Sequence, residues 1–317
     1  VDIARQAGPK VAELNVAGRG PLAELRKEIE PKAQELKEAL VPESPTPLPR
    51  CCCCCRTCAV LPLSSSAHLR TYLPSHAAPR TLRQLLTMSS GIDHVEDGDP
   101  VTAGDTVRML FQDGAQDMAA YAEAKPLAHA PGESFAYSTG STMILSDLMT
   151  RMLTNSEDPD VRRRAMQMFI DGRLKAPGRL PSLTPEYDAH GTMIGGSILH
   201  MTARDYGRFG ELLRRRGRTP AGHQILPEKW IDLMTTPSQR NPAYGLHIWL
   251  NRNSNESALM PGQAPESLFG CVGHNGQYIL ISPSQRLTVV RIGMSPRKEQ
   301  RRAVRAGLAR LMGLFPG

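Results

Sequence analysis

A serine and a lysine three residues apart would give this chain a nucleophile for acyl transfer. A serine hydroxyl is a poor nucleophile at neutral pH and needs a base within reach, and this spacing puts both groups on one face of a helix. Among the eight lysines of the sequence, only Lys298 has a serine three positions before it, Ser295. Pro296 stands in the first turn of that segment and the pair follows the last predicted strand, so we interpret it as a coincidence of spacing.

Other nucleophile and cofactor signatures are missing from the sequence. It contains no Gly-x-Ser-x-Gly turn, no His-Glu-x-x-His, no phosphate-binding loop and no dinucleotide glycine fingerprint. Six of the seven cysteines lie at Cys51 to Cys55 and Cys58, and the seventh is Cys271. The cysteine run lacks the paired spacing of a zinc site, so we predict no metal and no cofactor. We interpret it as a low-complexity tract, with metal binding or lipid modification as alternatives.

The chain divides into three segments of different composition. Residues 1–40 are rich in Ala, Glu, Lys and Leu at near-helical spacing, which predicts a charged amphipathic helix. Residues 41–80 are rich in Pro, Ser and Cys without periodicity, which predicts a low-complexity linker. Residues 81–317 have the pattern of a folded domain.

Helices and strands in residues 81–317 can be placed from the spacing of apolar residues. Helical spacing predicts helices over 81–88, 143–152 and 203–215. Runs rich in Tyr, Ile and Val predict strands over 245–250, 277–282 and 286–294, the last two joined by the turn 282–285 as an antiparallel hairpin. Helices followed by strands and a closing helix indicate an α+β fold.

Charge and hydropathy restrict the partners. The formal net charge is +7, and arginines cluster at 162–164, 214–218 and 297–310. Within the last cluster, apolar residues recur every three or four positions, which predicts a terminal helix packed on the core: Val304, Leu308, Leu311 and Phe315. No basic stretch interleaves aromatic residues that could stack on bases, so we predict no nucleic-acid partner. No apolar run reaches 18 residues, so we predict no membrane span, while the compartment and the oligomeric state stay open.

Four sequence segments together resemble one protein family. They are residues 81–91 (TLRQLLTMSSG), 131–139 (PGESFAYST), 195–209 (GGSILHMTARDYGRF) and 269–277 (FGCVGHNGQ). In this order they are similar to the serine β-lactamase and penicillin-binding-protein superfamily, in its branch of class C-type β-lactamases, esterases and aminohexanoate-oligomer hydrolases. The resemblance covers the C-terminal three quarters of the chain. It implies an antiparallel sheet flanked by helices, with a helical subdomain and an atypical N-terminal part.

The resemblance also implies which residues form a site. Tyr137 matches the tyrosine that carries a proton in the second motif of the family, and Thr139 replaces the asparagine that usually contacts substrate. His274 matches the basic position of the third motif, next to Asn275 and Gly276. We therefore expect Tyr137 and His274 to be catalytic and Thr139, Asn275, Gly276 and Gln277 to bind substrate, with the Gln277 amide in an oxyanion hole. A hydrogen-bonded buried tyrosine and a structural histidine are the alternatives.

The nucleophile stays unknown. The family places Ser-x-x-Lys several tens of residues before residue 81, where this chain has the charged helix and the cysteine run. The resemblance therefore implies a serine hydrolase that acts on small amides or esters through an acyl-enzyme. Because Ser-x-x-Lys is missing, we expect the chain as written to be defective. One alternative is a non-catalytic binding protein on the same fold, and another is an interaction protein that works through its N-terminal helix.

Overall fold

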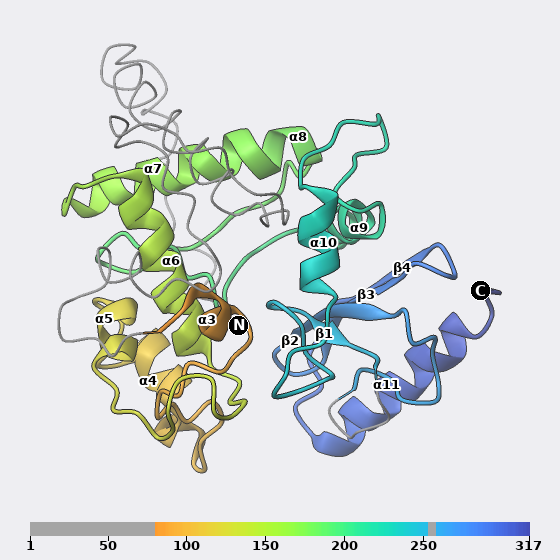
Figure 1. Ribbon diagram of the computed structural model, residues 1–317, viewed down its shortest axis with the longest axis horizontal. Helices are drawn as coiled ribbons and strands as arrows, with labels where there is room; N and C mark the ends of the chain where they lie inside the picture. The colour runs from red at the N-terminus through yellow and green to blue at the C-terminus, as the bar shows by residue number, and fades with distance from the viewer. Residues whose placement is uncertain (1–79, 253–257) are drawn as a thin grey trace, which may run out of the picture.

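The structure is a computed structural model that describes residues 80–252 and 258–317. The predicted helix over 1–40, the cysteine run and all but the last residue of the predicted linker over 41–80 lie outside the described residues. Figure 1 shows helices α3 to α8 on one side and a sheet with helices α9, α10 and α11 on the other. The expected α+β fold, an antiparallel sheet with flanking helices and a helical subdomain, is confirmed.

The helical subdomain is built from short helices that begin at polar caps. Thr81 caps α3 in a reciprocal pair with Gln84, and Ser138 and Asp158 cap α6 and α7 through their side-chain oxygens. The elements are α3 (Leu82–Leu86), η2 (Val101–Ala103), α4 (Asp105–Phe111), α5 (Met118–Glu123), α6 (Thr139–Leu153), α7 (Pro159–Ile170), η3 (Asp171–Lys175) and α8 (Ala176–Gly178). The predicted helices over 81–88 and 143–152 correspond to α3 and to most of α6.

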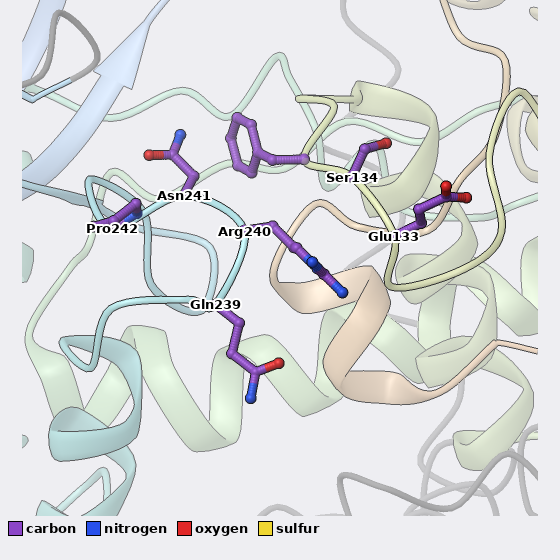
Figure 2. Close-up of a pocket in the computed structure, with 7 residues that line it drawn as sticks. Glu133, Ser134, Gln239, Arg240, Asn241 and Pro242 are labelled. Atoms are coloured by element: carbon purple, nitrogen blue, oxygen red, sulfur yellow. The ribbon is translucent and has the colours of Figure 1, made fainter.

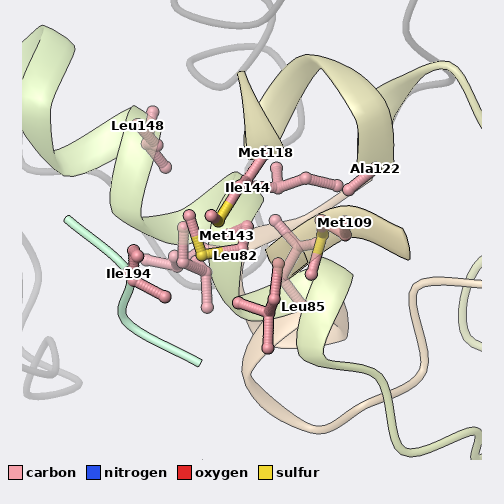
Figure 3. Close-up of a cluster of buried hydrophobic side chains, with 11 residues drawn as sticks. Leu82, Leu85, Met109, Met118, Ala122, Met143, Ile144, Leu148 and Ile194 are labelled. Atoms are coloured by element: carbon pink, nitrogen blue, oxygen red, sulfur yellow. The ribbon is translucent and has the colours of Figure 1, made fainter. Parts of the chain in front are cut away.

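The core of this subdomain lies around α6. Met143 and Ile144 of α6 are fully buried against Leu85 of α3 and Met109 of α4 (Figure 3). Each such side chain contributes about 1.5–3 kcal/mol through burial, so α6 is the element on which the others pack.

A buried ion pair fastens α6 to α7. Arg162 of α7 is fully buried and donates to the Asp147 carboxylate of α6. It also donates to Thr192 Oγ1 (2.9 Å) and to the carbonyl of His190 (2.9 Å). Because a buried charge without a partner is very costly, these bonds fix α7 and the loop at 188–192 relative to α6.

The sheet has four strands in the order β1-β2-β3-β4, and all neighbours are antiparallel. They are β1 (Trp249–Leu250), β2 (Phe269–Gly273), β3 (Gln277–Ser282) and β4 (Leu287–Arg291). The predicted strand over 277–282 matches β3, and the predicted hairpin is formed by β3 and β4. Strand β2 was not predicted, because its glycines give it no strand pattern.

Helices cover both faces of the sheet (Figure 1). Leu213 of α9 (Ala203–Arg214) and Ile231 of α10 (Glu228–Met234) pack with Ile279 and Ile281 on one face. Leu308 and Met312 of α11 (Lys298–Met312) pack on the other face. The predicted inner face of the terminal helix is right for Val304 and Leu308 but wrong for two other residues: Leu311 and Phe315 are 42% and 43% exposed.

Two predicted strands are shorter than expected. The strand expected over 245–250 begins only at Trp249, because the amides of Leu246 and His247 donate to Met234 and Leu86 rather than to a strand. The strand expected over 286–294 ends at Arg291, whose guanidinium turns back to the Gly293 carbonyl (2.5 Å). In the first strand, tertiary hydrogen bonds override the local preference for a strand.

Replacing Arg162 with alanine should destabilise the fold far more than replacing its neighbour Arg163. Arg162→Ala leaves Asp147 with one cation fewer in a buried site and should lower the free energy of unfolding by about 3–5 kcal/mol. Arg163→Ala removes an exposed ion pair with Asp160 and should cost about 0.5 kcal/mol. Urea unfolding followed by tryptophan fluorescence measures both, and equal losses would contradict this role of Arg162.

Candidate active site

Tyr137 lies just before α6 in a cluster of four aromatic rings. Its ring stacks on Trp249 (centroids 5.6 Å apart) and meets Tyr244 edge-on (6.0 Å). Phe135 contacts the same two rings, with centroid distances of 5.3 Å to Tyr244 and 6.3 Å to Trp249. The ring of Tyr137 is therefore held between the helical subdomain and the start of the sheet.

The hydroxyl of Tyr137 has no hydrogen-bond partner among the described residues. Tyr137 is half-buried, and its hydroxyl oxygen is not one of the buried polar atoms that lack a partner, so it is accessible to solvent. Burial raises the pKa of Tyr137 to about 12, and the nearby Glu96 carboxylate and Cys271 thiol act in the same direction. At neutral pH the phenol therefore keeps its proton and is available as a hydrogen-bond donor.

Thr139, the first residue of α6, is hydrogen-bonded to the carboxylate of Glu96, in the loop after α3. Glu96 accepts hydrogen bonds from the Thr139 amide (2.7 Å) and the Thr139 hydroxyl (2.5 Å). His94 Nε2 lies 3.3 Å from the same carboxylate and 3.0 Å from Thr106 Oγ1. Burial alone would raise the pKa of Glu96, but the hydrogen bonds from His94 and Thr139 outweigh it and hold the pKa below its usual value.

Gly195 and Gly196, which open the third segment that resembles the family, pack directly on α6. A Cβ on Gly196 would lie 2.6 Å from the Thr139 methyl group, and one on Gly195 would lie 2.2 Å from Ser146 Oγ. Only glycine allows this approach, so the turn closes one side of the first turn of α6.

The third-motif residues form the tight turn between β2 and β3. Gly273 pairs with Gln277, and the three residues between them make the turn. Asn275 and Gly276 have positive φ angles of 58° and 86°, which asparagine and glycine adopt most readily. His274 and the side chain of Gln277 are exposed, whereas Gly276 is buried.

This turn is anchored from the C-terminal side of the sheet. Arg291 donates to the Gly276 carbonyl (2.5 Å) and to Ser295 Oγ (2.8 Å), and the Ser295 amide donates to the Asn275 carbonyl (2.8 Å). Ser295 is 5% exposed and occupied by these bonds, which gives it a structural role. The side of Gly276 that lacks a Cβ faces Arg291, Ser295 and Arg301 rather than an open strand edge.

The structure brings the predicted site residues together in two groups. Tyr137 and Thr139 form one at the start of α6, and His274 to Gln277 form the other at the end of β2. No hydrogen bond, ion pair or ring contact joins the two groups in the described parts of the chain. Cys271 lies on β2, three residues before His274. It connects the two groups, because its thiol is close enough to Tyr137 to raise the pKa of that residue.

An open cavity of about 570 Å³ borders the aromatic cluster (Figure 2). Figure 2 shows Glu133 and Ser134 on one side of it and Gln239, Arg240, Asn241 and Pro242 on the other. Phe135 contributes to its lining and connects it to the rings around Tyr137. Ser134 Oγ is buried and has no hydrogen-bond partner among the described residues.

Ser90, Ser141 and Cys271 are poorly placed to act as nucleophiles. Ser90 and Ser141 are buried and bonded to each other (2.8 Å), and burial raises the pKa of the Cys271 thiol to about 11. The ionisable neighbours that shift the pKa of Tyr137 are Glu96 and Cys271, and neither is a cation. In residues 80–252 and 258–317, His, Cys, Asp and Glu side chains form no group that could hold a metal ion.

Sequence reasoning missed Glu96, His94, Tyr244 and Trp249 as parts of the site. Glu96 is 43 residues from Thr139 in the sequence, and nothing in its local pattern indicates the contact. Trp249 could have been suspected, because an aromatic residue stands at the start of the first strand. These residues join the site only through the fold.

Comparison with known proteins identifies the family. The family model described as Beta-lactamase matches residues 62–313, so this chain belongs to the Beta-lactamase family. This family of serine hydrolases acts on amide and ester bonds. The match includes residues 62–80, which the sequence analysis placed in the linker. No curated protein matches the chain significantly.

Solved structures of this superfamily share the fold. A "putative 6-aminohexanoate-dimer hydrolase" of Bacillus anthracis has a TM-score of 0.57 and 19% identity over 78% of this chain and 66% of that one. A β-lactamase from Mycobacterium bovis has a TM-score of 0.52 and 15% identity over 91% and 85%. A penicillin-binding protein from Bacillus halodurans has a TM-score of 0.51 and 15% identity over 78% of each chain. The chain thus spans just under two thirds of the length of the first protein.

No helix in the described parts of the chain is long and apolar enough to cross a lipid bilayer.

Removing the hydroxyl of Tyr137 should cost almost no stability. Tyr137→Phe keeps the ring contacts and breaks no hydrogen bond with the described residues, so the free energy of unfolding should change by about 0.5 kcal/mol or less. Tyr121→Phe is the matched control, because that hydroxyl donates to the Asp105 carboxylate (2.7 Å), and its loss should cost about 1.5 kcal/mol. Chemical denaturation measures both, and a large loss for Tyr137→Phe would mean that its hydroxyl has a structural partner.

Proposed function

We propose that this chain is a β-lactamase-related serine hydrolase for small amides or esters whose acyl-enzyme chemistry is defective in the sequence as it stands. The observation that carries the proposal is the protonated hydroxyl of Tyr137, which has no hydrogen-bond partner among the described residues, in a fold of this family. A donor of this kind suits the carbonyl or leaving group of an acyl compound.

We propose a role for each of the other predicted site residues from its position in the fold. His274 is exposed at the β2–β3 turn, where its imidazole can meet a polar group of the substrate. The backbone amide of Gln277, at the start of β3, is the proposed oxyanion donor. Asn275 and Gly276 shape the turn that presents these groups, and Thr139 holds the first turn of α6 on which Tyr137 depends.

The proposed defect concerns proton transfer. Acyl transfer requires a group that takes the proton of a serine, and a phenol with a pKa of about 12 does not do so at neutral pH without a nearby cation. The sequence has no Ser-x-x-Lys before residue 81 that would supply both the serine and the lysine. The chain alone would therefore bind an acyl compound without forming an acyl-enzyme.

A non-catalytic binding protein on the same fold is the second candidate. Two observations favour it: the cavity is present, and the charged neighbour of Tyr137 is a carboxylate rather than a lysine. In that case Tyr137 and His274 would be ligand contacts only. The two candidates differ in their coding DNA. The defective hydrolase should have a Ser-x-x-Lys in another reading frame, and the binding protein should not.

Exposure of the folded chain to a fluorophosphonate or a fluorescent penicillin should give no covalent adduct. Intact-protein mass spectrometry measures this directly, with an active serine hydrolase as positive control and a thermal melt to show that the chain is folded. An adduct mapped to one serine would contradict the proposed defect and identify a working nucleophile. Finding Ser-x-x-Lys in another reading frame of the coding DNA would favour the defective hydrolase over the binding protein.

A further inference from the structure

Glu96 is a partly exposed carboxylate at the candidate site. Its oxygens accept from the Thr139 amide, the Thr139 hydroxyl and His94, and its ion-pair contacts within the described residues include no lysine or arginine. A carboxylate accepts about four hydrogen bonds, so acceptor capacity remains after these three. The side chain is 25% exposed, which leaves this capacity accessible to a ligand.

His94 contacts Glu96 through one ring nitrogen. Its side chain is fully buried, and Nε2 is the nitrogen that faces Thr106 and Glu96. Nδ1 is buried without a hydrogen-bond partner among the described residues. The hydrogen bonds from His94 and Thr139 hold the pKa of Glu96 below its usual value, so its carboxylate is ionised at neutral pH.

The charge of Glu96 acts where a substrate would lie. Thr139, which Glu96 holds, is two residues from Tyr137, and the carboxylate raises the pKa of both Tyr137 and Tyr244 in the aromatic cluster. Burial lowers the local dielectric constant, so this field is stronger than that of a surface carboxylate. A ligand bound against Tyr137 would therefore carry its substituents into a negative potential.

We infer that Glu96 makes the site selective for amides or esters that carry a protonated amine and against those that carry a carboxylate. This inference rests on the proposed function, since it assumes that an acyl compound binds beside Tyr137. Glu96 is then a specificity-determining residue that acts through its charge, in addition to holding Thr139.

Substitution with glutamine separates the two roles of Glu96. In Glu96→Gln the amide oxygen can still accept from the Thr139 amide, and the new NH₂ group can donate to the Thr139 hydroxyl, so the local structure is kept while the charge is lost. Glu133→Gln removes the charge of an exposed glutamate in the lining of the neighbouring cavity, and it tests whether that charge, rather than the charge of Glu96, carries the selectivity.

The test compares three linear primary amides of similar length: 4-aminobutanamide, which is cationic, pentanamide, which is neutral, and glutaramate, which is anionic. NMR titration of the full chain should give an affinity for the cation about tenfold higher than for the neutral amide, with the anion weakest. The preference should weaken as salt is added, a readout that needs no variant. Glu96→Gln should abolish the preference, and Glu133→Gln should retain it.

Each other outcome is decisive. Equal affinity for the three ligands, or a preference that survives Glu96→Gln, would overturn the inference and leave the proposed amide site standing. Loss of the preference in Glu133→Gln but not in Glu96→Gln would assign the selectivity to the cavity rim and also overturn it. If none of the three binds to folded wild-type protein, both the inference and the proposed function fail.

Discussion

The first turn of α6, residues 139–142, is the point on which the candidate site depends. Glu96 binds Thr139 from one side, Gly196 packs on Thr139 from another, and Ser90 bonds to Ser141. His247, from the segment before β1, lies 2.9 Å from Thr142 Oγ1. Four segments far apart in the sequence thus converge on one helical turn, and Tyr137 stands immediately before it.

His247 also explains how the helical subdomain and the sheet are joined. Its amide donates to the carbonyl of Leu86 (2.9 Å), and Nδ1 lies 3.0 Å from the same oxygen. Burial lowers the pKa of His247, opposed in part by the bond to Leu86, so a neutral ring fits this junction. The junction places Tyr244 and Trp249 against Tyr137, and β2 then leads to the turn that carries His274. The two groups of predicted site residues therefore owe their relative placement to a buried contact outside both motifs.

The sequence predicted the elements whose pattern is local and missed those that depend on tertiary contacts. Helix α9 and strand β3 have clear apolar periods, and their predicted ranges match within a residue. Strand β2 has too much glycine to show a pattern, and Gly270 in fact packs on the backbone of Ile279. The carboxylate at Thr139 could not be predicted, because a contact between residues 43 positions apart leaves no trace in one sequence. The resemblance to the family located Tyr137 and His274 but says nothing of the residues that hold them.

We propose that Tyr137 and the turn at 273–277 contact one bound acyl compound across the junction between helices and sheet. Backbone NMR mapping with a neutral amide tests this shared site, because the two groups report independently. A shared site should give concerted shifts at Tyr137 and at His274 to Gln277 with one dissociation constant. Shifts confined to one group, or two different dissociation constants, would contradict a single shared site.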